Sequence, residues 1–281
     1  MRRGLARLTG QQLTTELRSA NALVVALFSL LIQIYAMMPV VQFCDAAGVN
    51  MTPFATVFVF NDVYYTFLSS VMSLGMIALC AGAPFMNQYQ IQVLLRTGRR
   101  RWLRGQFGYL AVLSLIYTAY WALCPLLCAF GRIEWSADWG KIWTTLSFTD
   151  AARQLRIMLD VPYSIVAQFE PMQALGLSIA LRFLYIFILG MIVFVGNLIS
   201  RSCAGVVAGI LMTLVDYMLT RDGRFVEMFW ASPLTLTRLS MLDPTNTWTS
   251  PTPGEALMVL GILAAVLSLY MLLAADRHID I

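Results

Sequence analysis

The feature that most constrains this 281-residue chain is a series of long apolar runs. An α-helix needs about 20 mostly apolar residues to cross the hydrocarbon core of a bilayer. Six runs meet this requirement with almost no charged residues: 20–43, 62–83, 107–130, 172–200, 203–219 and 255–275. The sequence therefore predicts an all-α, polytopic membrane protein with six transmembrane helices in a single transmembrane domain.

Composition agrees with this class. Hydrophobic residues make up 59% of the chain and charged residues 12%, whereas roughly a quarter of the residues in soluble domains are charged. The net charge of +4 is small, and the basic residues gather beside the apolar runs and not in a separate stripe. We therefore expect no nucleic-acid partner. The five cysteines lie mostly within or at the ends of apolar runs, where they pack as small hydrophobic side chains.

Charge fixes the expected orientation. The loop between the second and third runs has no acidic residue and five arginines: Arg96, Arg99, Arg100, Arg101 and Arg104. Short loops rich in arginine stay in the cytoplasm. Both termini are then cytoplasmic, and residues 131–171 and 221–254 are external. With this topology the cytoplasmic side holds eleven cations and three acids, and the external side holds seven cations and eleven acids.

Residues 87–106, the coupling segment, also have a local pattern. Asn87 is a suitable N-cap, Ile91, Leu94 and Leu95 share one helical face, and Gly98 is suited to end the helix. The pattern predicts a short amphipathic helix at the cytoplasmic surface. Two interpretations remain open: a topology determinant that rests on lipid headgroups, or a helix that a cytoplasmic partner protein binds.

The regions outside the runs also contain helical patterns. Residues 1–19 are basic with loosely spaced leucines, which predicts an interfacial helix. Pro39 is expected to break the first span near its outer end. In the external region 131–171, three tryptophans suggest contact with the membrane surface or with a second helix of the same insert, and the region is expected to pack as a lid against the spans: Trp135, Trp139 and Trp143. In the external region 221–254, Ser232 and Pro233 predict the start of a short half-membrane or interfacial helix.

Catalytic and metal-binding patterns are absent from the sequence. The only histidine is His278, so neither a serine–histidine pair nor a histidine-based metal site can be built within the membrane. The chain has no GxxxxGK[ST] phosphate-binding loop. We therefore expect no enzymatic activity and no cofactor in this chain.

Arg182 and Asp216 are the two charges that remain inside the apolar runs. Charges in a membrane are costly unless they are paired or hydrated, which makes them functional candidates. On antiparallel neighbouring helices they fall at similar depth. A structural ion pair is the leading interpretation, and substrate contact, snorkelling or a misplaced span boundary are the alternatives.

Taken together, the six spans, the basic helical loop and the stretch YQIQVLLRTGRRRWLRGQ at 89–106 resemble the membrane permease subunit of the type-2 ABC exporter family. The chain departs from the family at the start of this loop, where it has Asn87, Gln88 and Gln90 in place of a glutamate. Its external region between the third and fourth spans is also longer than expected.

The resemblance implies a function for the coupling segment. It implies a permease that pairs with a second copy or a homologous permease in a bacterial plasma membrane and exports an amphiphilic peptide, drug or lipid-like cargo. A separate ATPase subunit would bind ATP and Mg²⁺ and dock on Tyr89, Ile91, Leu94, Leu95, Arg96, Arg99, Arg100 and Arg101. The alternatives are a stand-alone secondary carrier or channel, and a non-transporting membrane scaffold or sensor.

Overall fold

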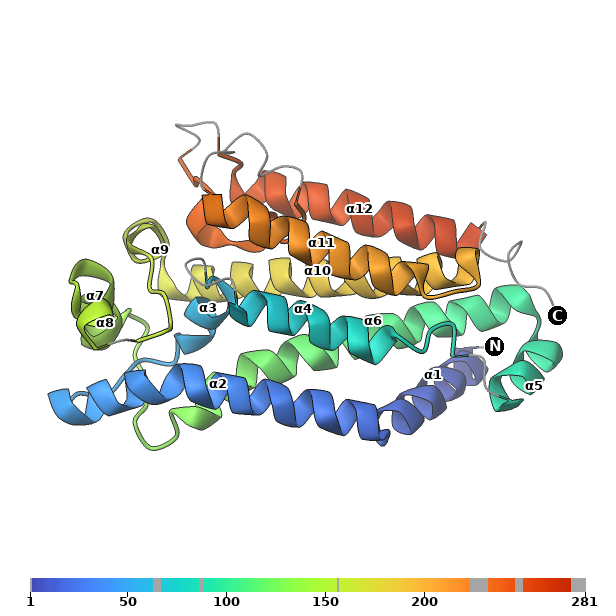
Figure 1. Ribbon diagram of the computed structural model, residues 1–281, viewed down its shortest axis with the longest axis horizontal. Helices are drawn as coiled ribbons and strands as arrows, with labels where there is room; N and C mark the ends of the chain where they lie inside the picture. Colours follow the sequence, from blue (N-terminus) through green and yellow to red (C-terminus); the bar gives the residue numbers. More distant parts are fainter. Residues whose placement is uncertain are drawn as a thin grey trace.

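The computed structural model describes residues 2–62, 67–85, 88–155, 157–222, 232–245 and 250–273, and these form a helical bundle (Figure 1). Its α-helices are α1 (Arg2–Leu17), α2 (Ala20–Ala47), α3 (Ala55–Phe60), α4 (Phe67–Cys80), α5 (Gln88–Thr97), α6 (Arg99–Cys128), α7 (Gly140–Phe148), α8 (Ala151–Gln154), α9 (Tyr163–Gln168), α10 (Pro171–Ser200), α11 (Ala204–Asp222) and α12 (Pro253–Leu273). Two 3₁₀ turns, η2 (Thr235–Thr237) and η3 (Leu239–Met241), lie between α11 and α12. No strand is formed within the described ranges.

Four helices are long and apolar enough to cross a membrane: α2, α6, α10 and α12. Shorter apolar helices, α4 and α11, occupy the remaining two of the six predicted runs. The structure is therefore a helical membrane protein. Of the six apolar helices, α2, α6 and α11 run away from the end at which α1 and α5 lie, and α4, α10 and α12 run toward it, so that direction alternates along the chain (Figure 1). The helices α7, α8 and α9 lie at the opposite end of the bundle. We call these the α5 end and the α7 end.

The central helix is α10, which contacts α4, α6, α11 and α12. Its packing on α11 depends on two glycines near the α5 end. A Cβ on Gly196 would lie 2.5 Å from the Cα of Gly205, and a Cβ on Gly205 would lie 2.2 Å from the carbonyl oxygen of Val193. The backbones can approach this closely only because neither residue has a side chain. Asn197 adds a cap, since its Oδ1 accepts from the backbone N–H of Gly205 at 2.9 Å.

At the α7 end, the described residues of 131–171, which we call the insert, pack against α3. All six residues of α3 are buried. Trp143 Nε1 donates to the backbone oxygen of Thr52 at 3.1 Å, and the Trp143 ring lies 4.7 Å from that of Phe58. Trp139 is buried beside it, whereas Trp135 is 81% exposed. Trp139 and Trp143 are therefore packed inside the protein, and of the three tryptophans only Trp135 is exposed enough to contact a membrane surface.

Two expectations about chain breaks were wrong. Pro39 does not end the first helix, because α2 continues through it to Ala47. Residues 232–245 do not form a half-membrane α-helix, because they fold into η2 and η3. They also lie deep in the protein, since both turns contact α10. We call these residues the 232–245 segment.

Candidate functional sites

The coupling segment forms two helices with a sharp bend between them. α5 ends at Thr97, and the N–H of Gly98 closes the last turn by donating to the oxygen of Leu94 at 2.9 Å. Gly98 has φ 80°, a backbone conformation that residues with a Cβ rarely adopt. Because α6 starts at the next residue, α5 is joined to this long helix without a flexible loop.

One face of α5 is fixed to the bundle. Trp102 Nε1, on the first turns of α6, donates to Gln90 Oε1 at 2.9 Å, and both side chains are buried. Leu94 is 2% exposed and belongs to the hydrophobic core. The N-terminal helix reaches the same region, because Gln12 Nε2 donates to Gln106 Oε1 of α6 at 2.8 Å. α5 and α1 are therefore both attached to the base of α6.

The other face of α5 points away from the protein. Ile91 is 39% exposed and Leu95 is 62% exposed, one helical turn apart. Four exposed arginines follow Leu95 in the chain, one on α5 and three at the start of α6: Arg96, Arg99, Arg100 and Arg101. The residues of the predicted docking face therefore do not share one exposed surface. Leu94 packs into the protein, whereas Ile91 and Leu95 are accessible. The side chain of Tyr89 lies outside the described residues.

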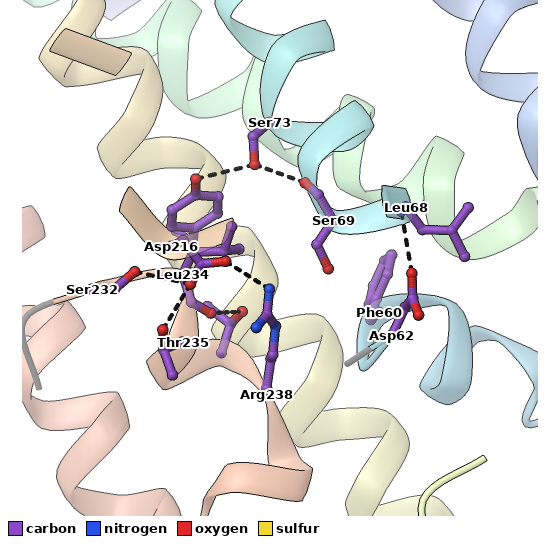
Figure 2. A network of polar contacts seen from close by, with 12 residues as sticks. Phe60, Asp62, Leu68, Ser69, Ser73, Asp216, Ser232, Leu234, Thr235 and Arg238 are labelled. Atoms are coloured by element: carbon purple, nitrogen blue, oxygen red, sulfur yellow. Dashed lines mark hydrogen bonds and ion pairs between the residues drawn. The ribbon is translucent and has the colours of Figure 1, made fainter. Parts of the chain in front are cut away.

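A second site is built around Asp216, near the α7 end of α11 (Figure 2). Its Oδ2 is 2.7 Å from Arg238 Nη2, and both side chains have no exposed surface. Its Oδ1 accepts from Ser232 Oγ at 3.0 Å and from Thr235 Oγ1 at 2.7 Å. The Asp216 cluster, defined as Asp216, Ser232, Thr235 and Arg238, thus joins α11 to the 232–245 segment by a buried salt bridge and two hydroxyl bonds.

The salt bridge is not the one expected. Arg182 is also fully buried, but its Nη2 donates to the backbone oxygen of Phe60 and, at 3.2 Å, to Ser69 Oγ. Its guanidinium lies 5.8 Å from the centre of the Phe60 ring. Arg182 therefore binds α3 and α4. The salt bridge of Asp216 is with Arg238, which the sequence analysis assigned to the external region 221–254.

Sequence reasoning also missed Asn61 at the end of α3. This buried amide donates through Nδ2 to the oxygen of Val57 at 2.7 Å and to Ser178 Oγ at 2.9 Å. Its Oδ1 accepts from the backbone N–H of Leu239 at 2.6 Å. Asn61 therefore joins α3 to the 232–245 segment, in addition to the contacts from α11. The one available signal was its position next to Asp62, between two apolar stretches.

A groove of about 640 Å³ opens between α2 and α11 with α4 as its floor. Its lining is mostly apolar and comprises Tyr35, Phe67, Ser70, Leu74, Met158, Ile210, Thr213, Leu214 and Tyr217. The neighbouring faces of α2 and α11 expose further large apolar side chains, such as Leu31 at 64% and Leu211 at 55%. The groove therefore suits an apolar or amphiphilic occupant.

No family model, curated protein or solved structure matches this chain. Within the described ranges, no group of three or more histidine, cysteine, aspartate or glutamate side chains is placed to hold a metal ion. His278 lies outside the described residues.

Proposed function

We propose that this chain is the permease subunit of an ATP-driven exporter, with a separate ATPase bound at α5. In this proposal α2, α4, α6, α10, α11 and α12 all cross a plasma membrane, with the α5 end in the cytoplasm. A second permease, identical or homologous, completes the transporter. The cargo is amphiphilic, and ATP and Mg²⁺ are bound by the ATPase subunit.

The observation that supports this function best is the exposed face of α5. Ile91 and Leu95 are large apolar side chains on a short helix at the end of the bundle, and exposed arginines follow them at the junction with α6. Apolar anchors with a charged rim are typical of a protein-binding surface. The sequence has no phosphate-binding loop, so energy from ATP would have to reach this chain through such a contact.

Because α5 is attached to α6, an ATPase subunit bound at α5 could move the long helices. Because Gln90 bonds Trp102 and Leu94 packs in the core, a force on α5 acts directly on α6. α6 in turn contacts α1, α2, α10 and α12. Closure of two ATPase subunits on paired α5 helices would therefore reposition the long helices and change access to the cargo path.

The groove between α2 and α11 supports the cargo class. It is lined mainly by apolar side chains, with the hydroxyls of Ser70 and Thr213 among them. Such a lining favours a molecule with a substantial apolar part. A peptide, a drug or a lipid-like molecule fits this description.

A stand-alone secondary carrier is the second candidate. It is favoured by the charged side chains that lie buried in and beside the long helices, because intramembrane charges often mark transport pathways. Arg182, Asp216 and Arg238 are such residues. A carrier of this kind needs no ATPase, so the binding partner at α5 distinguishes the two candidates.

The test is co-purification of the tagged full-length chain from cells that express its partners. We expect an ATPase subunit to be recovered with the wild-type chain and to be lost, by at least ten-fold, from the double variant Ile91→Asp and Leu95→Asp. Each substitution would bury a carboxylate in an apolar contact, where the charge has no partner, and this lowers the binding affinity.

Gln92→Asp is the matched control, because Gln92 is exposed on the same helix between the two anchors. It adds a carboxylate to α5 without removing an apolar side chain and should retain the ATPase. Recovery of no ATPase with the wild-type chain, or equal recovery with all three proteins, would contradict the proposal.

A further inference from the structure

The groove between α2 and α11 has a recess at one end. A cavity of about 10 Å³ adjoins the groove and shares three of its lining residues: Tyr35, Phe67 and Met158. Leu74 lies two turns after Phe67 on α4, toward the α5 end, and it lines the groove but not the small cavity. The recess therefore lies at the end of the groove that is nearer to the insert.

Asp62 is the charged residue of this recess. It is 1% exposed, and its Oδ2 accepts from the backbone N–H of Leu68, on the first turn of α4, at 3.3 Å (Figure 2). The other lining side chains carry no charge: Ile32, Tyr35, Ala36, Phe67, Leu68 and Met158. Because charges attract more strongly in such surroundings than in water, the recess favours a cation.

Four charged residues of the described chain are no more than 1% exposed: Asp62, Arg182, Asp216 and Arg238. Of these, only Asp62 lines the groove or its recess. Asp216 and Arg238 form a salt bridge with each other. Arg182 lies near Asp62, because it binds the backbone oxygen of Phe60, but it lines neither cavity. Among the residues that line these cavities, a ligand therefore meets a carboxylate and no guanidinium.

The size of the recess limits the cationic group that it can hold. About 10 Å³ is close to the room that one water molecule needs, so a primary ammonium fits and a trimethylammonium group does not. An ammonium has three donors, and its hydrogen bonds to a carboxylate are roughly twice as strong as bonds between neutral groups. The groove itself, about 640 Å³, has room for the apolar part of a drug-sized molecule.

We propose that the groove and its recess bind a cationic amphiphile, with a primary ammonium group at Asp62 and the apolar part between α2 and α11. This narrows the cargo from amphiphiles in general to those that carry a primary amine. The inference rests on the proposed function where it identifies the ligand as cargo. The binding site itself can be tested without an ATPase.

The probe is dansylcadaverine, in which an alkyl chain joins an apolar fluorophore to a primary ammonium. Its affinity is measured by dansyl fluorescence with the purified full-length chain in nanodiscs of zwitterionic lipid, and the signal of empty nanodiscs is subtracted. Two derivatives are compared with it: the N-acetyl form, which has no charge, and the N-trimethyl form, which keeps the charge but is too large for the recess. We expect the primary amine to bind at least ten-fold more tightly than either derivative.

Equal affinity for the primary amine and either derivative would overturn the proposal. An equally bound N-acetyl form would show that charge is not recognised, and an equally bound N-trimethyl form would show that the recess does not hold the cationic group. This comparison uses the wild-type chain, so it remains decisive if a variant of Asp62 does not accumulate in the membrane.

Three variants locate the site. Asp62→Asn should bring the affinities of dansylcadaverine and its N-acetyl form together, because the attraction for the cation is lost. Asp45→Asn is the matched control, because Asp45 is an acid near the outer end of α2 that lines neither cavity, and it should keep the ten-fold preference. Leu214→Trp narrows the groove and should weaken both probes. A preference that survives Asp62→Asn, or an affinity unchanged by Leu214→Trp, would contradict the proposed site.

The binding measurement and the co-purification of an ATPase have independent outcomes. If the primary amine is preferred and no ATPase is recovered with the chain, the cation site stands and the exporter function fails. If an ATPase is recovered and the three probes bind equally, the exporter function stands and the cation site fails.

Discussion

Asp216 and Arg238 illustrate how a buried charge is tolerated beside apolar helices. Each has no exposed surface, and Asp216 also receives two hydroxyl groups. Burying an ion pair costs several kcal/mol of desolvation, which the partners and their hydrogen bonds offset. The stability of the α7 end should therefore depend on the pair being complete and not on either charge alone.

Truncation of Asp216 tests this dependence. Asp216→Ala leaves the Arg238 guanidinium buried without its carboxylate, so we expect the free energy of unfolding to fall by about 3–5 kcal/mol. The double variant Asp216→Leu with Arg238→Met removes both charges at similar volume and should recover most of the loss. Thermal unfolding of the purified proteins in detergent measures both effects. A double variant no more stable than Asp216→Ala would show that the pair is not the unit of stability.

Charge alone could identify Arg182 and Asp216 in the sequence, because each interrupts an apolar run. It could not identify their partners. Arg238 lies in a stretch with prolines and hydroxyl residues, which has the composition of an exposed loop. Its burial depends on contacts with α10 and α11, which are distant in the chain, and local pattern does not contain that information.

At the scale of the helix, the pattern of α5 was predicted and its orientation was not. The helix ends at Thr97, directly before Gly98, the residue that the sequence indicated as its end. A shared face for Ile91, Leu94 and Leu95 could not show which side chain faces the protein, because an apolar stripe is wide enough for both the core and a partner. The attachment of Gln90 to Trp102 rotates Leu94 inward and leaves Leu95 outward.

The packing of α10 on α11 gives a second prediction at this scale. Gly205→Ala places a Cβ against the carbonyl oxygen of Val193, so we expect the free energy of unfolding to fall by about 1–3 kcal/mol. Gly176→Ala is the control, because Gly176 lies in the same helix pair and a Cβ added there would meet no atom within 4 Å. It should be neutral or slightly stabilising, since alanine favours helix more than glycine. Thermal unfolding compares the two variants, and equal losses would contradict the close approach.

For the molecule as a whole, the alternation of helix direction agrees with the charge pattern of the chain. The junction of α5 and α6, which carries the arginine cluster of residues 96–104, lies at the same end as the basic α1, away from α7, α8 and α9 (Figure 1). Hydropathy predicted six apolar runs, because a helix that crosses a membrane must be apolar over its own length. Four of them form helices long enough to cross a membrane, and α4 and α11 are shorter. The burial of the 232–245 segment could not be predicted from hydropathy, because it depends on contacts that form only in the assembled bundle.

The proposed function depends on the cytoplasmic position of α5, and the sidedness of two cysteines tests it most directly. Gln92→Cys on α5 and Ala137→Cys in the insert are both at exposed positions and would be made separately in the Cys128→Ser, Cys203→Ser background. With an impermeant maleimide, we predict that Ala137→Cys is labelled in intact cells and Gln92→Cys only after permeabilisation. Labelling of Gln92→Cys in intact cells would place α5 outside, beyond the reach of any ATPase, and would contradict the proposed function.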